Sequence, residues 1–137
     1  MVEQVGVEQV GAEQADADLL ALIAAGDHGA LAAALDGGAA PDVSDRWGVS
    51  ALCHAAARGD LQAVRLLLDR GAQVDRPSDV GNSALMAAAA AGHVEVLRLL
   101  LERGADPARV NKWGFGAQDW GSWPANAAEV LALLRSR

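Results

Sequence analysis

Leucine and valine recur at helical spacing between residues 60 and 70, where they share one side of a predicted helix: Leu61, Val64, Leu67 and Leu68. Gly71 follows this segment, and glycine readily takes the left-handed conformation that ends many helices. The pattern therefore predicts a helix over Asp60 to Arg70.

A shorter, alanine-rich segment precedes that helix. Ser50 stands at its start, where a serine hydroxyl accepts a hydrogen bond from a backbone N–H of the first turn. The segment runs to Arg58 and stops at Gly59, which separates it from the second helix. We expect the two segments to form one helical hairpin.

The hairpin pattern returns 33 residues further along the chain. Residues 48–75 align with residues 81–108 with 15 of 28 positions identical, among them three glycines, a Ser-Ala-Leu start and a Leu-Leu-Leu run. A lone hairpin cannot bury its apolar side, so neighbouring hairpins must stack into a solenoid. Other glycines extend the register in both directions, and we expect units at about 17–44, 45–77, 78–110 and 111–137.

The two internal units have the sequences DRWGVSALCHAAARGDLQAVRLLLDRGAQVD (residues 45–75) and GNSALMAAAAAGHVEVLRLLLERGAD (residues 81–106). They resemble the repeats of the ankyrin family, and the resemblance extends over about residues 15–137. It implies an all-α solenoid of helix-turn-helix units with protruding finger loops. Two full internal repeats would be flanked by two divergent caps.

Both internal units depart from the family pattern at the start of the first helix. Where the family has Thr-Pro-Leu-His, this chain has Ser50 to Cys53 and Ser83 to Met86. The histidine that ties neighbouring loops together in the family is missing, so we expect these loops to lack that tie.

The last unit departs further. Large residues stand where the family has small ones, namely Trp120, Trp123 and Pro124, and we expect its second helix to lie one residue out of register. Trp120 is expected in the core of the cap, whereas Trp123 is expected near the groove.

The resemblance also implies a binding surface, because finger loops and the exposed side of the first helices form the concave face of an ankyrin solenoid. Transferred by position, this face comprises three fingertip groups and several helix residues: Arg46, Trp47 and Val49; Asp79, Val80 and Asn82; Lys112, Trp113 and Phe115; and Ala57, Arg58, Ala90, Ala91 and Trp123. Trp47, Val80 and Trp113 are 33 residues apart, which predicts an apolar ladder with steps of about 10 Å.

Tryptophan is enriched among binding hot spots, so we interpret Trp47 and Trp113 as contact residues. The plainer interpretation is that each ring folds down onto its own hairpin or shields an end of the stack. We favour a non-catalytic binding protein that recognises a protein partner through its tryptophan-bearing concave face.

A second hypothesis makes the groove a small-molecule site in a cofactor-independent enzyme, for example one of natural-product biosynthesis. Its pocket would lie between Trp113, Trp123 and His54. His54 would then act as a general acid or base, with Asp79 and Arg58 available to bind or polarise the substrate. The alternative for His54 is packing between first helices, and the neighbouring Cys53 is expected to be buried.

Composition limits the remaining classes. With 137 residues, of which 52% are hydrophobic, the chain can form the core of one domain without disulfide or metal cross-links. Its single cysteine precludes an intrachain disulfide, and four Cys or His ligands at zinc spacing are absent, so we expect neither metal nor other cofactor. We found neither a signal-like start nor an apolar run of about 20 residues, and we therefore expect a soluble cytoplasmic protein without membrane contact.

The acidic charge is concentrated at the start of the chain. Net charge is −7, but the first 18 residues contain five acids and no base, so the remainder is close to neutral and nucleic-acid binding is not expected. Residues 1–16 repeat the pentad Val-Glu-Gln-Val-Gly, which predicts an acidic low-complexity tail. A homodimer through this tail is a further expectation.

Overall fold

The computed structural model describes residues 19–136, so the predicted tail at residues 1–16 lies outside the described residues. Residues 19–25 are helical. The helices that follow are α2 (His28–Asp36), α3 (Ala51–Arg58), α4 (Leu61–Asp69), α5 (Ala84–Ala91), α6 (Val94–Glu102), α7 (Ala117–Trp120) and α8 (Ala127–Arg135).

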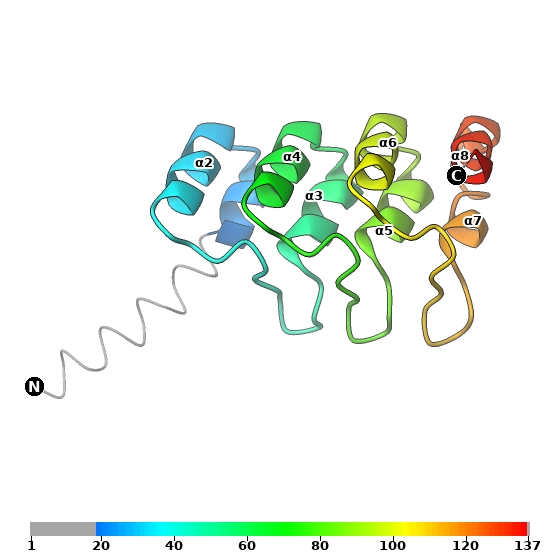
Figure 1. Cartoon of the computed structure of the whole chain (residues 1–137), viewed down its shortest axis with the longest axis horizontal. Helices are drawn as coiled ribbons and strands as arrows, with labels where there is room; N and C mark the ends of the chain where they lie inside the picture. The colour runs from blue at the N-terminus through cyan, green and yellow to red at the C-terminus, as the bar shows by residue number, and fades with distance from the viewer. Residues whose placement is uncertain (1–18, 137) are drawn as a thin grey trace, which may run out of the picture.

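These helices form two parallel rows (Figure 1). In the inner row α3 contacts α5 and α5 contacts α7, and in the outer row α2, α4, α6 and α8 each contact the next. Long loops project from the inner row on one side of the molecule and precede α3, α5 and α7. The all-α solenoid with protruding fingers, which the sequence predicts, is confirmed.

Local signals set the helix bounds. The Ser50 hydroxyl accepts the backbone N–H of Cys53 at 3.1 Å, and the Ser83 hydroxyl accepts that of Met86 at 3.4 Å. Gly59 ends α3 with a φ of +72°, a conformation that side chains with a Cβ rarely adopt. Both predicted helices are found, and the second is one residue shorter at each end than expected.

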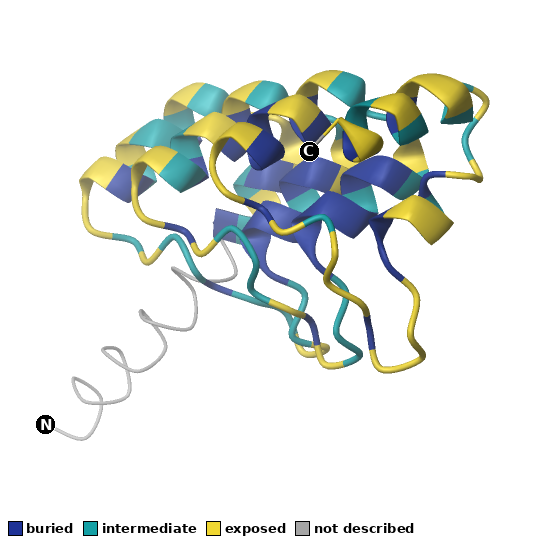
Figure 2. Cartoon of the chain, turned by 45° about the vertical axis from the view of Figure 1, so that its right-hand side comes forward, coloured by how far each residue is buried: buried dark blue, intermediate teal, exposed yellow. Residues whose placement is uncertain are grey.

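Small side chains on the inner helices let the two rows pack closely. Ala55, Ala56, Ala88 and Ala89 are fully buried, and they meet branched side chains of the outer helices such as Val64 and Leu97. Figure 2 shows the buried residues along the inner row and on the sides of the outer helices that face it. This arrangement buries one continuous apolar core while each unit contacts mainly its neighbours.

The last unit differs from the sequence-based expectation. α8 begins and ends 33 residues after α6, so the predicted register shift of the second helix is wrong. The irregularity lies in the first helix instead, because α7 has four residues where α3 and α5 have eight. Residues 121–126 form turns in place of its second half.

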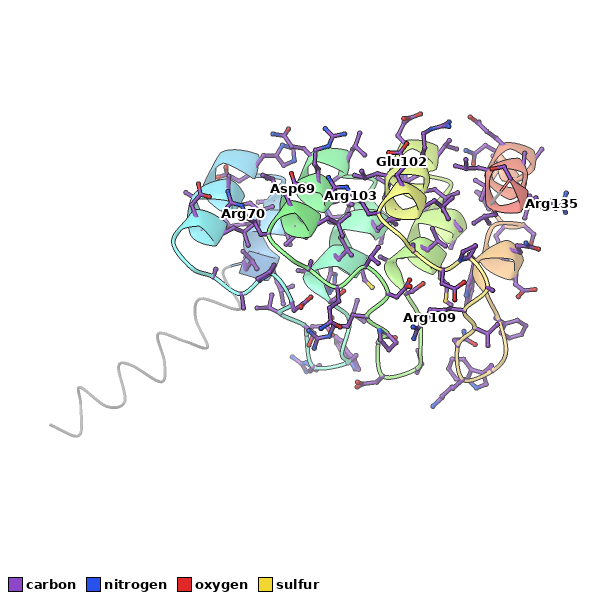
Figure 3. All side chains as sticks on the ribbon, in the orientation of Figure 1. Asp69, Arg70, Glu102, Arg103, Arg109 and Arg135 are labelled. Atoms are coloured by element: carbon purple, nitrogen blue, oxygen red, sulfur yellow. The ribbon has the colours of Figure 1, made fainter. Side chains whose placement is uncertain are left out.

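Side chains tie each unit to the next. Arg70 pairs with Asp36, and Arg103 Nη2 lies 2.7 Å from Asp69 Oδ1. Figure 3 labels Asp69 and Arg103 at the ends of the neighbouring helices α4 and α6. His93 occupies the N-cap position of α6 without a side-chain capping bond, and its Nε2 donates instead to the Ala57 carbonyl at 3.1 Å. These polar groups therefore hold successive hairpins in register.

Candidate functional site

Each finger is closed at its base by a polar side chain at the same repeat position, occupied by Asp45, Ser78 and Asn111. Asp45 Oδ1 accepts the backbone N–H groups of Trp47 at 2.9 Å and Val49 at 3.0 Å. Asn111 Oδ1 does the same for the two equivalent residues of the last finger at 2.9 and 3.0 Å, and Ser78 Oγ accepts the N–H of Asn82 at 3.2 Å. These bonds fix the backbone that carries each fingertip.

Backbone hydrogen bonds also join neighbouring fingers. The N–H of Asp79 donates to the Trp47 carbonyl at 3.1 Å, and the N–H of Lys112 donates to the Val80 carbonyl at 3.0 Å. The fingers approach so closely that a Cβ on Gly48 would meet the Asp79 carboxylate at 2.3 Å. The family histidine is absent from both internal units, as the sequence shows, and backbone hydrogen bonds join the neighbouring loops in its place.

The structure places Trp47, Val80 and Trp113 in the turns of three successive fingers. The two tryptophans are 62% and 60% exposed, whereas Val80 is half-buried. A basic side chain covers each tryptophan, with Arg46 5.1 Å from the Trp47 ring centroid and Lys112 5.0 Å from that of Trp113. The outer two fingertips thus each present an indole together with a cation.

A groove of about 350 Å³ opens between the fingers and the inner helices. Its lining is mostly apolar and comes from α3, α5, α7 and two fingers: Trp47, Val49, Cys53, His54, Ala57, Ser78, Asp79, Val80, Asn82, Ser83, Met86, Ala87, Ala90 and Trp120. Small side chains on the helices and larger ones at the rim give the groove its depth.

The predicted site residues separate into two groups. The groove is lined by Trp47, Val49, His54, Asp79, Val80 and Asn82. The others lie outside it, namely Arg46, Arg58, Lys112, Trp113, Phe115 and Trp123. Arg58 is exposed on α3, so the geometry does not unite it with His54 in one cavity.

The pocket predicted between Trp113, Trp123 and His54 is wrong in its position. His54 lines the groove, but neither of these tryptophans does. Trp123 is 77% exposed because α7 ends at Trp120, so the helical projection that aimed Trp123 at the groove no longer applies. It lines a separate hollow of about 270 Å³ with Phe115, Asp119, Trp120 and Ser122.

Trp120 is the groove residue that sequence reasoning placed only in the core. It packs against the core and also separates the groove from the second hollow. Its ring meets Phe115 edge-on, with centroids 6.3 Å apart. The signal was present in the register, since His54, Ala87 and Trp120 are 33 residues apart and all three line the groove.

His54 is oriented by a carboxylate, with Nε2 2.9 Å from Asp45 Oδ2. Burial alone would raise the pKa of Asp45, but the N–H groups of Trp47 and Val49 and the His54 ring outweigh it and hold this pKa below its ordinary value. Asp45 therefore links the finger backbone to the groove.

Cys53 is buried beside His54 in sequence, and its burial raises the pKa of its thiol above the ordinary value, although Ser50 opposes this shift. A thiol held in its neutral form is a poor nucleophile, so Cys53 serves as an apolar lining residue. Within residues 19–136, no group of three or more His, Cys, Asp or Glu is placed to hold a metal ion.

A family model of ankyrin repeats in three copies matches residues 19–111, and the chain belongs to the ankyrin repeat family. Repeats of this family generally act as protein-interaction modules. The match ends where the last finger begins, but the helix pair α7 and α8 continues the two rows beyond it. No curated protein matches the sequence. None of the helices in the described part of the chain is long and apolar enough to span a bilayer.

Proposed function

We propose that this protein binds a segment of a partner protein across its concave face, which comprises the three fingertips and the groove beneath them. The observation that carries this proposal is the exposure of Trp47 and Trp113 at 62% and 60%, each under a basic side chain. Exposed indoles are costly in water and are common anchors of protein interfaces.

The groove complements the fingertips as a receptor for an anchoring side chain. Ala57, Ala87 and Ala90 leave space between the helices, and His54 and Trp120 close two sides. A volume of about 350 Å³ accommodates a large apolar side chain and part of its backbone. Ordered fingers lower the entropy lost on binding, because the finger backbone is already fixed by hydrogen bonds.

Site-specific photocrosslinking in lysate of the source cells tests this proposal. A benzophenone amino acid at Val80, between the two tryptophans, is compared with one at Gln62, which is exposed on the outer helix α4. We expect a discrete adduct from position 80, none from position 62, and loss of the adduct in the Trp47→Ala/Trp113→Ala background. Equal adducts from both positions, or an adduct that survives the double substitution, would contradict the concave-face assignment.

The His54 to Asp45 pair supports a second candidate, a small-molecule site with acid–base chemistry. An imidazole held by a carboxylate at 2.9 Å resembles the oriented bases of many enzymes, and the groove volume lies within the range of small-molecule sites. The ligand would be an apolar, planar molecule that fits beside Trp120.

Thermal-shift screening with a metabolite library separates the two candidates. Ala87→Leu fills the groove, whereas Ala91→Leu alters an exposed residue of the same helix. If the groove holds a small molecule, stabilising compounds lose their effect in Ala87→Leu and keep it in Ala91→Leu. Catalysis further requires that His54→Gln abolishes turnover while the compound still binds. A screen without compounds sensitive to Ala87→Leu would remove this candidate.

A further inference from the structure

We infer that the acidic N-terminal segment of this chain, residues 1–18, binds across the fingertips of the same molecule and competes with the partner there. The inference rests on the proposed function, because it assigns an internal competitor to the proposed binding face. It is carried by charge, by spacing and by the point at which the segment joins the solenoid.

Charge is the first argument. Arg46 and Lys112 are exposed at the outer two fingertips, and neither forms an ion pair within residues 19–136. The segment carries five acids and no base, and three of the acids are glutamates that each follow an apolar residue: Glu3, Glu8 and Glu13. An apolar residue beside a carboxylate matches an indole beside a cation, which is what each outer fingertip presents.

Spacing is the second argument. The Arg46/Trp47 and Lys112/Trp113 pairs lie two units apart, which is about 20 Å when units stack at helix-packing distance. Glutamates recur every five residues in the segment, and five extended residues span about 17 Å. Successive Val-Glu or Ala-Glu pairs therefore fall about 3 Å short of the spacing between the basic fingertips, a gap that the flexible side chains of glutamate, Arg46 and Lys112 can span.

The middle finger fits the same alignment. It carries Asp79 and Val80 in place of a base and an indole, and so offers no site for a carboxylate. Between Glu3 and Glu8 the segment supplies only uncharged residues, including Val5 and Val7. When these valines contact Val80, the glutamates on either side of them lie away from the Asp79 carboxylate.

The point of attachment is the third argument. Leu19, the first described residue, is buried and lies in the repeat position of Leu52 in α3 and Leu85 in α5. The first described helix therefore begins in the same repeat register as α3 and α5, each of which follows a finger. Eighteen extended residues reach about 60 Å, which exceeds the length of four stacked units at about 10 Å each.

Tryptophan indole N–H signals in ¹H–¹⁵N spectra of the full chain test the inference. The variant Glu3→Gln/Glu8→Gln/Glu13→Gln is compared with Glu95→Gln/Glu102→Gln/Glu129→Gln, which changes net charge equally but on exposed residues of the outer helices. We expect the Trp47 and Trp113 signals to shift in the first variant only, with Trp120 unchanged in both. Salt at about 0.5 M should produce the same shift in the native chain, because it screens the ion pairs.

A synthetic peptide of residues 1–16, added to the first variant, should return both signals toward their native positions. Identical spectra of the two variants would overturn the inference, and so would a peptide without effect. Native-chain signals that move on tenfold dilution would also overturn it, since contact would then occur between copies. Photocrosslinking to a partner at Val80 does not depend on these spectra, so failure here leaves the proposed function standing.

Discussion

The ring of His93 lies against Gly59 of the preceding unit so closely that a Cβ on Gly59 would come within 2.6 Å of His93 Nδ1. The contact lets His93 Nε2 reach the Ala57 carbonyl. One glycine therefore serves two purposes, since it ends α3 in the left-handed conformation and leaves room for the side chain that joins two hairpins.

Gly59→Ala should destabilise the protein more than Gly71→Ala. Both glycines have positive φ, but nothing lies within 4 Å of a Cβ on Gly71. We expect a loss of about 1 kcal/mol for Gly71→Ala from backbone strain, and about 3 kcal/mol for Gly59→Ala, which also displaces His93. Urea unfolding measures both values. Equal losses would show that the His93 contact has no energetic weight.

Asp45→Ala should cost about 1 to 2 kcal/mol, because two finger N–H groups lose a charged acceptor. Asp45→Asn should cost less, since Asn111 makes the equivalent two bonds in the last finger. Chemical unfolding of both variants checks this order, and an asparagine variant as unstable as the alanine variant would contradict it.

The difference in the free energy of unfolding between the native chain and Asp45→Asn should depend on pH. The pKa of Asp45 is lowered in the folded state, so its ionisation stabilises the fold above its ordinary pKa of 3.8. That stabilisation is lost as pH falls through the folded-state pKa. Unfolding curves between pH 7 and pH 2 should converge for the two proteins at the acid end. A stability difference that grows on acidification would mean that folding raises the pKa of Asp45.

Trp120→Phe should change the free energy of unfolding by less than about 1 kcal/mol. The indole Nε1 of Trp120 is buried and has no hydrogen-bond partner within residues 19–136, and phenylalanine removes this donor while keeping the ring against Phe115. Trp120→Ala should cost about 3 kcal/mol, because it empties the wall between the two hollows. Thermal unfolding compares the two variants. A phenylalanine variant as unstable as the alanine variant would mean that the indole N–H of Trp120 contributes to stability.

The ion pair between Arg103 and Asp69 should contribute less than 1 kcal/mol, because both side chains are partly exposed. A double-mutant cycle with Arg103→Ala and Asp69→Ala measures it, and about 0.5 M salt should reduce the coupling toward zero.

Arg76→Ala should lower the free energy of unfolding by more than the Arg103–Asp69 pair contributes, by about 1 to 2 kcal/mol. Arg76 is half-buried and donates to the Asp42 carbonyl and to Ser44 Oγ. If salt changed the stability loss of Arg76→Ala more than it changed the Arg103–Asp69 coupling energy, the buried contacts of Arg76 would not be the stronger ones.

The repeat explains why the fold is readable from sequence. Ser50, Gly59 and Gly71 act on the chain within a few residues of themselves, so caps and helix ends follow from local chemistry. Stacking then follows from the period, because each hairpin meets a near copy of itself. The role of Asp45 and Asn111 as finger caps does not follow from the register, because it depends on the geometry of the turn.

The groove was harder to predict because it depends on where α7 ends. Trp123 stands at the repeat position of Ala57 and Ala90, both of which line the groove, yet the short helix carries it away. Trp120 takes its place at the position of His54 and Ala87. Helical spacing predicts the direction of a side chain only within the helix. Because α7 ends at Trp120, Trp120 lines the groove and Trp123 does not.

The four-residue α7 also sets the order in which the solenoid opens. Stability in a row of repeats is a sum of unit and interface terms, and a halved helix offers its neighbour α5 a smaller contact than α3 does. Amide hydrogens of α8 should therefore exchange with deuterium earlier than those of α5 and α6. Fraying from this end would release the Trp120 side of the groove first while the Trp47 finger keeps its shape.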